Sequence, residues 1–216
     1  MGGEEKFVFQ RIFDFSDYKE KPRHVERINY NDTRHFILNV HYAQRMPSIS
    51  YAFGLFVSGQ LTGVCTFGSP ASHYLCKGIC GENFYSEVLE LNRLVLLNNK
   101  KNEASFLISQ SLKLLPKPKI IVSYADTEHE HIGTVYQATN FLFTGTTKER
   151  TDIAGDFGKH SRHHNGDLKN RVKRSAKHRY VYFLGNKKEK MLFKSNLNYP
   201  VYNYPKKKER MSINGY

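Results

Sequence analysis

Residues 88–126 read VLELNRLVLLNNKKNEASFLISQSLKLLPKPKIIVSYAD, and this stretch decides the fold. Its first part, 88–97, is an apolar run typical of a strand, and the polar residues 98–102 indicate a turn. Apolar residues then recur at helical spacing over 104–115, until two prolines end the run ahead of a second strand at 119–124. The stretch therefore predicts strand, turn, helix and strand, which is a unit of an α/β protein.

The chain before this unit is predicted to supply an antiparallel sheet. Two β-rich runs, 50–57 and 61–67, are joined by a Ser-Gly-Gln turn and indicate a hairpin. Upstream, helical spacing predicts a helix over 32–46, and alternation over 7–15 predicts a further strand. Residues 68–84 show no periodicity and read as a long loop.

After the unit, a helical stretch over 126–140 precedes a strand at 141–146. A last strand is predicted at 179–184, ahead of a Lys-rich tail. An antiparallel N-terminal sheet joined to a strand–helix–strand–helix unit is the layout of a GNAT-type N-acyltransferase domain. We therefore expect an α/β, GNAT-like fold in which helices flank a central mixed sheet.

We expect a single domain with an insertion. The GNAT-like core takes residues 1–147, and a basic, His-rich insertion nearly free of apolar residues takes 148–178. The last strand and a Lys- and Tyr-rich tail, 179–216, are expected to complete the same domain.

The positive charge is concentrated near the C-terminus. The 216-residue chain has a formal net charge of +13, and residues 159–210 hold 16 Lys and Arg against three acids, whereas the other residues hold 17 of each sign. Tyrosines lie among these bases, which favours a nucleic acid partner over a merely solubilising tail. The candidate DNA-binding residues are Arg162, Lys169, Arg171, Lys173, Arg174, Lys177 and Arg179.

Other classes of protein are excluded by composition. No stretch approaches the roughly 18 to 20 apolar residues that span a bilayer, and the N-terminus is acidic, so we expect neither a membrane partner nor secretion. The odd set of cysteines, Cys65, Cys76 and Cys80, suits free thiols in the cytoplasm. His73 with Cys76 and Cys80 is too sparse a set to favour zinc.

Several stretches resemble the Mom proteins of Mu-like bacteriophages. They are HY at 41–42, RMP at 45–47, ELNRLV at 90–95, NEASF at 102–106, VSYAD at 122–126, HIGTVYQATNF at 131–141 and KHRYVYF at 177–183. The resemblance covers roughly residues 36 to 205. It implies a GNAT-fold enzyme, working in the cytoplasm of a bacterial host, that converts adenine in phage DNA to N6-(carbamoylmethyl)adenine and so protects the DNA from restriction.

The resemblance also implies the important positions, which are His41, Tyr42, Arg93, Ser105, Asp126 and Tyr136. Asp126 follows an apolar strand, where a carboxylate could be a general base or a helix cap. Tyr136 could protonate a leaving group or be a core tyrosine. Arg93, in the middle of a strand, needs an anionic partner, either Glu90 or a ligand.

The remaining positions have two readings each. Ser105 could bond a carbonyl or phosphate, or be a helix-surface hydroxyl. His41 and Tyr42 could contact the acceptor or be structural residues. Iron has been suggested for the family, and these two residues with Asp126 are the candidate metal ligands.

The donor site departs from the common GNAT pattern, in which a Gln/Arg-x-x-Gly-x-Gly/Ala loop binds the pyrophosphate of coenzyme A. Here the turn is NNKKNEA, residues 98–104, with no glycine. Lys100, Lys101 and Asn102, with Ser105, still suit a phosphate. We therefore favour glycyl-tRNA slightly over acetyl-CoA as the acyl donor.

Two other functions stay open on the sequence alone. One is a DNA-binding protein without catalysis, and the other is a GNAT acyltransferase acting on tRNA or protein. The insertion histidines His160, His163 and His164 suit a solvated face near phosphates better than a metal site. The oligomeric state is not determined by the sequence, and a dimer is compatible with it.

Overall fold

The computed structural model describes residues 22–153 and 171–206, which build one seven-stranded sheet and a separate two-stranded ribbon. The strand order in the large sheet is β1-β2-β3-β4-β5-β9-β6. The strands are β1 (Arg23–Arg27), β2 (Tyr51–Val57), β3 (Gln60–Gly68), β4 (Val88–Leu96), β5 (Lys119–Asp126), β6 (Leu142–Thr146), β7 (Arg150–Ile153), β8 (Arg171–Arg174) and β9 (Lys177–Leu184). The helices are α2 (Tyr30–His35), α3 (His73–Cys80), α4 (Glu103–Leu114), α5 (Thr134–Ala138) and α6 (Lys187–Ser195), with shorter turns η2 (Phe36–Val40), η3 (Glu82–Glu87) and η4 (Thr127–His129).

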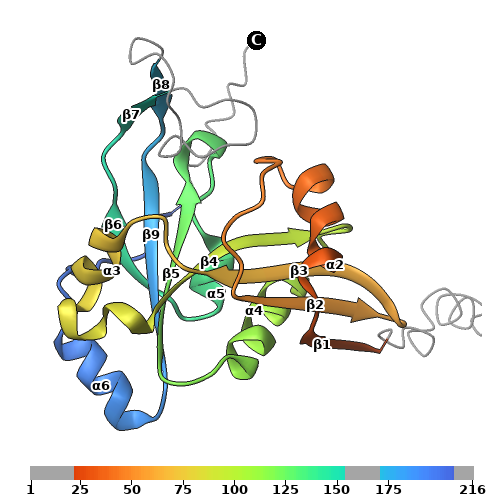
Figure 1. The fold of residues 1–216 in the computed structure, drawn as a ribbon, viewed down its shortest axis with the longest axis horizontal. Coiled ribbons are helices and arrows are strands. Elements are labelled where there is room, and N and C mark those ends of the chain that lie inside the picture. The colour runs from red at the N-terminus through yellow and green to blue at the C-terminus, as the bar shows by residue number, and fades with distance from the viewer. Residues whose placement is uncertain (1–21, 154–170, 207–216) are drawn as a thin grey trace, which may run out of the picture.

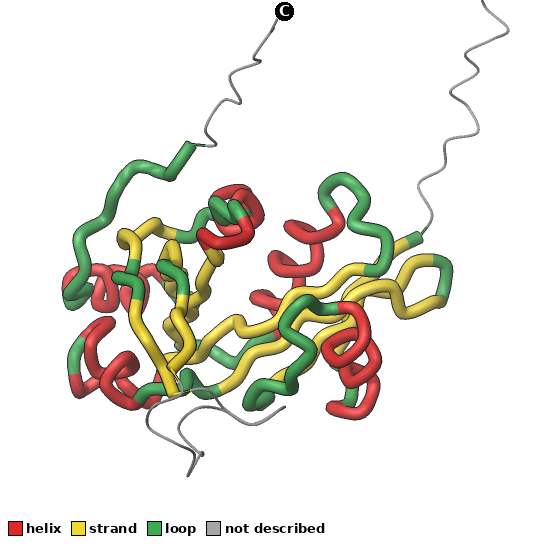
Figure 2. The backbone as a smooth tube through the Cα atoms, turned by 90° about the horizontal axis from the view of Figure 1, so that it is seen from above, coloured by secondary structure: helices red, strands yellow, loops and turns green. Residues whose placement is uncertain are grey.

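The large sheet is mixed, as the sequence predicts. Strands β1 to β4 pair antiparallel, β4 pairs parallel with β5, and β9 lies antiparallel between β5 and β6. Helices cover both sides of the sheet (Figures 1 and 2). The antiparallel strands β1 to β4 are thus continued by β5, which pairs parallel with β4 and is connected to it through α4. This arrangement confirms the GNAT-like layout.

The two largest of three apolar clusters among the described residues, one on each face of the sheet, hold the layers together. On one face, α4 and α5 contribute Leu107, Ile108 and Tyr136 to a core that also contains Phe53 and Tyr180. The opposite face packs against α3 and α6 through residues that include Ile79, Val122 and Phe193. Burying an apolar side chain of this size stabilises a fold by about 1.5–3 kcal/mol.

The predicted hairpin is confirmed. Strands β2 and β3 pair from Tyr51↔Phe67 to Val57↔Gln60. The turn residues Ser58 and Gly59 both have positive φ, 51° and 78°, which is the backbone of the tight turn that suits a twisted hairpin.

Residues 68–84 are not a loop, contrary to the prediction, because they contain α3. Cys76, Ile79 and Cys80 recur at helical spacing and are buried against the sheet. The tail likewise contains α6, whose first turn is closed by reciprocal hydrogen bonds between Asn186 and Glu189. Both helices are short, so few residues carry their periodicity.

Two predicted helices are shorter than expected. The first begins at Tyr30, since Asp32 Oδ2 accepts the N–H of Asn29 at 3.0 Å, and its last π-helical turn ends at Val40. The stretch 126–140 is helical only in η4 and α5, because Glu130 and Gly133 between them adopt left-handed φ of 53° and 73°. The strand predicted at 7–15 lies outside the described residues.

The chain after α6 covers the edge strand β6. The N–H of Tyr202 donates to the carbonyl of Phe143 at 2.9 Å, and Tyr204 Oη donates to the carbonyl of Phe141 at 2.8 Å. These tyrosines therefore hold the tail to the domain, which is a structural role that the sequence pattern did not indicate.

Strands β7 and β8 form a ribbon that projects from the body of the molecule (Figure 1). We call this ribbon, residues 150–153 and 171–174, the arm. No helix within residues 22–153 and 171–206 is long and apolar enough to cross a bilayer.

Candidate active site

The candidate site lies where β4 and β5 part. Their parallel pairing runs from Val88↔Ile120 to Glu90↔Val122 and then stops, although both strands continue. Beyond this point Ser123 Oγ donates to the carbonyl of Leu91 at 2.9 Å. Glu90 is thus the last residue of β4 that pairs with β5, and we call the divergence of the two strands beyond it the opening.

Glu90 has the properties of a general base, and the sequence considered it only as a partner for Arg93. It is partly buried, and burial raises its pKa to about 7 against the opposing effects of Arg93 and Lys177. A carboxylate with this pKa accepts a proton effectively at neutral pH. An acid within a mostly apolar strand was the available signal in the sequence.

A bulge in β4 follows Glu90. Thr66 faces Arg93 whereas Phe67 faces Leu91, so no residue of β3 stands opposite Asn92 in the backbone register. The Asn92 amide donates to the carbonyl of Ser48 at 2.7 Å and accepts from Thr66 Oγ1 at 2.7 Å. The bulge therefore ties β4 to the segment that contains Ser48.

Within residues 22–153 and 171–206, Arg93 forms no ion pair with Glu90, and its hydrogen bonds go to backbone carbonyls. It donates from Nη1 to the carbonyl of Asn92 at 2.6 Å and from Nη2 to that of Arg45 at 2.8 Å, while its buried Nε lacks a partner among the described residues. Burial and the nearby Arg45 lower the pKa of Arg93. The prediction of an anionic ligand therefore stays open.

His41 and Tyr42 lie at the end of η2, next to Arg93. Their rings stack, with centroids 4.4 Å apart and planes at 27°. Burial, then Arg93 and His131, lower the pKa of His41 to about 4, so its imidazole is neutral at pH 7. Tyr42 is 58% exposed.

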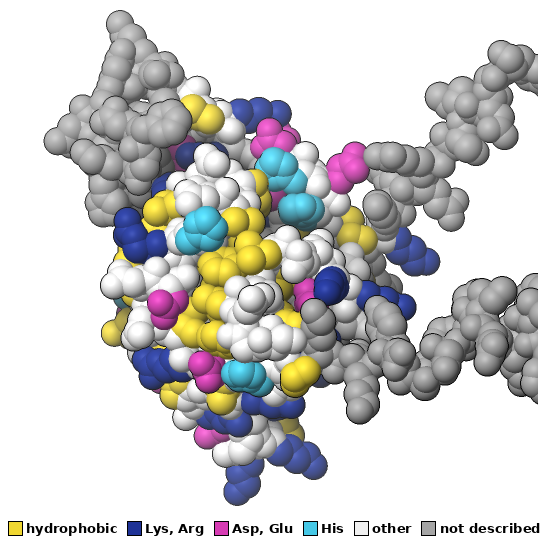
Figure 3. Space-filling view, turned by 90° about the vertical axis from the view of Figure 1, so that its right-hand side faces the viewer, with side chains coloured by type: hydrophobic (Ala, Val, Ile, Leu, Met, Phe, Trp, Pro, Cys, Tyr) yellow, Lys and Arg dark blue, Asp and Glu magenta, His cyan; other side chains and the backbone are white. Residues whose placement is uncertain are grey.

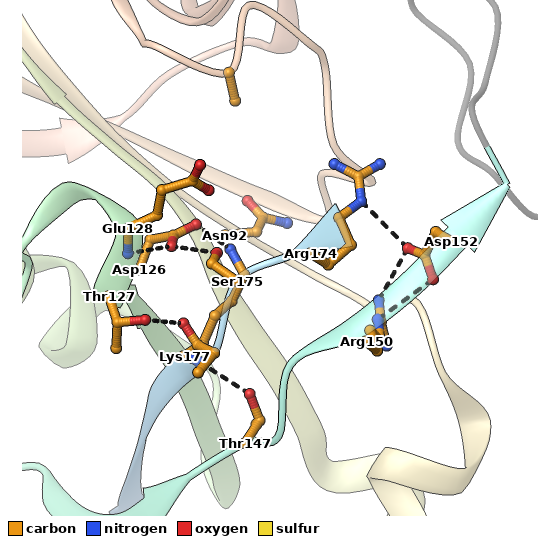
Figure 4. Close-up of polar contacts among 12 residues, drawn as sticks. Asn92, Asp126, Thr127, Glu128, Thr147, Arg150, Asp152, Arg174, Ser175 and Lys177 are labelled. Carbon is orange, nitrogen blue, oxygen red and sulfur yellow. Dashed lines mark hydrogen bonds and ion pairs between the residues drawn. The ribbon is translucent and has the colours of Figure 1, made fainter. Parts of the chain in front are cut away.

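Asp126 is bound by its own protein (Figure 4). Ser175 Oγ and Lys177 Nζ each donate to its carboxylate at 2.5 Å, and the N–H of Glu128 donates at 3.1 Å. Burial alone would raise the pKa of Asp126, but the bonds from Lys177 and Ser175 outweigh it and leave the pKa below its ordinary value. A carboxylate held in this way is a weak base.

The same contacts anchor the base of the arm. Ser175 follows β8 directly and Lys177 begins β9, and Thr127 Oγ1 donates to the carbonyl of Ala176 between them at 2.6 Å. Asp126 therefore joins the end of β5 to the start of β9, at the point where the arm leaves the sheet.

Tyr136 lies in the core on the α4 side of the sheet. Its ring packs against Phe141 and Tyr180, with centroids 5.5 and 5.2 Å apart. Burial raises its pKa to about 12, and a hydrogen bond with Ser123 opposes the shift. A protonated hydroxyl thus contacts the residue that bridges the opening between β4 and β5.

The predicted donor residues lie at the start of α4. Lys100 and Lys101 are exposed, and Asn102 has a left-handed φ of 65°. Ser105 Oγ donates to the carbonyl of Asn102 at 3.1 Å, as a helix-surface hydroxyl does. The buried Glu103 accepts the N–H of Lys100 at 3.2 Å, so a carboxylate already lies at this helix end.

Iron ligation by His41, Tyr42 and Asp126 stays a prediction. Within residues 22–153 and 171–206, no group of three His, Cys, Asp or Glu side chains is placed to hold a metal ion. Cys76 and Cys80 are buried, and the ring of His73 packs against Tyr85 instead. The insertion histidines lie outside the described residues.

The candidate DNA-binding residues fall into three groups. Arg171, Lys173 and Arg174 are exposed on the arm, where Arg150 joins them. Surface ion pairs link Lys173 to Glu149 at 2.8 Å, and Arg174 and Arg150 to Asp152 at 3.3 and 3.4 Å. Lys177 donates to the Asp126 carboxylate, and Arg179 Cζ lies 3.3 Å from the ring centroid of Tyr199. Both side chains therefore contact groups of the protein itself. Arg162 and Lys169 lie outside the described residues. Elsewhere, Lys and Arg side chains are scattered among acids around one face (Figure 3).

A model of the Mom protein family matches residues 23–206. The chain belongs to the Mom protein family. A relative within it, the methylcarbamoylase Mom of Escherichia phage Mu, is 29% identical over 204 residues, which cover 91% of this chain and 81% of that protein. The matched range contains β4, β5, the arm and η2, and therefore the whole candidate site.

Solved acetyltransferases also match this Mom family chain. A GNAT family acetyltransferase from Bacillus cereus has a TM-score of 0.45 at 15% identity, covering 76% of this chain and 99% of its own. The acetyltransferase yncA from Salmonella typhimurium, solved with acetyl-CoA, has a TM-score of 0.48 at 11% identity, covering 76% and 95%. The strand order of the chain itself identifies its GNAT-like fold.

Proposed function

We propose that this Mom family protein is a transferase that modifies adenine in DNA, giving N6-(carbamoylmethyl)adenine. Its family membership and its methylcarbamoylase relative identify a transferase. The observation that carries the proposal is the position of Glu90, a carboxyl with a pKa near 7 at the mouth of the β4–β5 opening. The exposed basic arm supports DNA as the acceptor.

The structure supports a division of labour among the site residues. The exocyclic amine of adenine is a poor nucleophile, so a base must take its proton as the new bond forms. We assign this step to Glu90 and give Asp126 a positioning role, because the Asp126 carboxylate is occupied by Lys177 and Ser175. Tyr136, protonated at neutral pH, is the proposed proton donor to the leaving group.

For the donor we propose a glycyl ester, as in glycyl-tRNA. Adenine N6 attacks the ester carbonyl, Glu90 takes its proton, and the ribose hydroxyl leaves. The glycyl amine then attacks C6 through a five-membered ring and the C6–N6 bond breaks, which yields the isomeric carbamoylmethyl group without redox chemistry. The glycine-free turn and the Glu103 carboxylate at the start of α4 support a donor other than coenzyme A.

The test is to incubate the purified protein and DNA with glycyl-tRNA labelled in glycine or, in parallel, with labelled acetyl-CoA, and to weigh the digested nucleosides. We expect deoxyadenosine heavier by one labelled glycyl unit. Label from acetyl-CoA alone would exclude the glycyl donor but keep the adenine acceptor. Label in tRNA or protein, or unchanged adenine with both donors, would contradict the proposed function.

Removing the positive charges of the arm is expected to weaken binding to DNA of any sequence. In the triple variant Arg171→Gln, Lys173→Gln and Arg174→Gln, the slope of log affinity against log salt should fall by about 2, because each lost phosphate contact removes about 0.7–0.9. The matched control replaces Lys187, Lys188 and Lys190 of α6 with glutamine, and its slope should fall less. Equal slopes in the arm variant and the unaltered protein would count against the arm as the DNA contact.

A further inference from the structure

Four aromatic rings from distant parts of the chain gather beside the candidate site. Tyr42 stacks on His41, and it also contacts His129 and His131 at centroid distances of 4.7 and 6.4 Å. The ring centroids of His129 and His131 lie 5.8 Å apart. We call these four residues the ring cluster.

The ring cluster faces solvent. Tyr42, His129 and His131 are exposed, and only His41 is partly buried. Aromatic rings usually lose their water-exposed area in a core, and here the rings meet at the surface instead. The cluster therefore presents solvent-exposed aromatic side chains at the surface.

The position of the cluster is fixed against β4. Arg93 bonds the carbonyl of Arg45, three residues after Tyr42, and Asn92 bonds the carbonyl of Ser48. Arg93 lowers the pKa of both His41 and Glu90. The guanidinium is therefore close enough to act electrostatically on both the ring cluster and the proposed base.

The hydrogen-bonding state of His41 is also set. Its Nδ1 accepts the N–H of Ala43 at 3.0 Å, so in the neutral imidazole the proton is on Nε2. The His41 ring therefore offers one N–H donor, which is at Nε2. Ring nitrogens of adenine are acceptors for such a donor.

We propose that the ring cluster is the stacking platform for the adenine being modified, with Tyr42 against the face of the base and His41 Nε2 donating to a ring nitrogen. This inference rests on the proposed function and adds His129 and His131 to the acceptor site. A base taken out of the duplex loses its stacking neighbours, and an aromatic platform replaces them.

The test measures binding without donor, so that no chemistry is needed. A fluorescent oligonucleotide with one adenine in a chain of abasic spacers is compared with an all-abasic strand. The unaltered protein should prefer the adenine strand by about 5- to 150-fold, as expected for one base stacked on an aromatic residue. Tyr42→Ala should erase this preference, Tyr42→Phe should keep it, and the double variant His129→Ala and His131→Ala should weaken it.

The matched control is Tyr85→Ala, because Tyr85 is 44% exposed and packs against His73 at 5.0 Å, but outside the site. Its preference for adenine should equal that of the unaltered protein. Preference retained in Tyr42→Ala, or no preference in the unaltered protein, would overturn the stacking platform. If the unaltered protein prefers the adenine strand but leaves adenine unmodified in the labelling assay, the proposed function is contradicted and the stacking platform is not.

Discussion

Glu90→Gln is expected to slow transfer to adenine by about 10²- to 10⁴-fold, which is the usual contribution of a positioned general base. Glutamine keeps the size and polarity of the side chain but accepts no proton from the amine. The measurement is the single-turnover rate at saturating donor. A rate at pH 8 equal to that of the unaltered protein would remove Glu90 from the mechanism.

The pH profile gives this prediction a second readout. Because burial raises the pKa of Glu90 to about 7, the rate of the unaltered protein should rise with pH and level off above about 7. The residual rate of Glu90→Gln should lack this rise. Asp126→Asn should keep it, since the pKa of Asp126 is below its ordinary value and its carboxylate is ionised throughout this range.

Stability measurements separate a lost base from a damaged fold. The raised pKa means that the folded state favours protonated Glu90, so the protein loses stability as the pH rises from the ordinary carboxyl pKa through 7. The loss is on the order of 3 kcal/mol. Glu90→Gln should therefore be as stable as the unaltered protein near pH 4 and more stable at pH 8, where it is slow.

Gly133→Ala is expected to destabilise the fold by about 2–6 kcal/mol, from left-handed backbone strain and an overpacked core. Gly133 has φ of 73°, and an added Cβ would lie 2.4 Å from Tyr180 Cε2. Tyr180 is fully buried and its hydroxyl bonds the carbonyl of Ile132 at 2.5 Å, so the ring has no free direction to move. Denaturant unfolding measures the change.

Gly59→Ala is the matched control. Gly59 has a similar φ of 78°, but an added Cβ would meet nothing within 4 Å. Its substitution should cost only the backbone strain, about 1 kcal/mol. If both variants lost the same stability, the contact with Tyr180 would have no part in the effect.

The elements that depend on local pattern were predictable. The β4–α4–β5 unit and the β2–β3 hairpin follow from apolar periodicity and turn residues that lie next to one another in the chain. Helices α3 and α6 were missed because their periodicity is carried by few residues, such as Phe193, and becomes visible only once they pack on the sheet.

The sequence predicted several residues of the candidate site but not the role of each. Arg93, His41 and Tyr42 do lie together, but the sequence favoured Asp126 as the base and left Glu90 aside. Asp126 binds Ser175 and Lys177, which lie about fifty positions further along the chain, and no local pattern reports such a contact. Arg179 is likewise engaged by Tyr199, although its charge alone suited DNA.

The sequence by itself determined the order of strands and helices around residues 88–126, the basic C-terminal region and the resemblance to Mom proteins. Only the tertiary structure decided which carboxyl titrates near neutral pH, which cations are exposed on the arm and which rings join Tyr42. The physical reason is that periodicity and propensity are set by neighbours in the chain. Protonation and availability depend on burial and on partners that folding brings from distant segments.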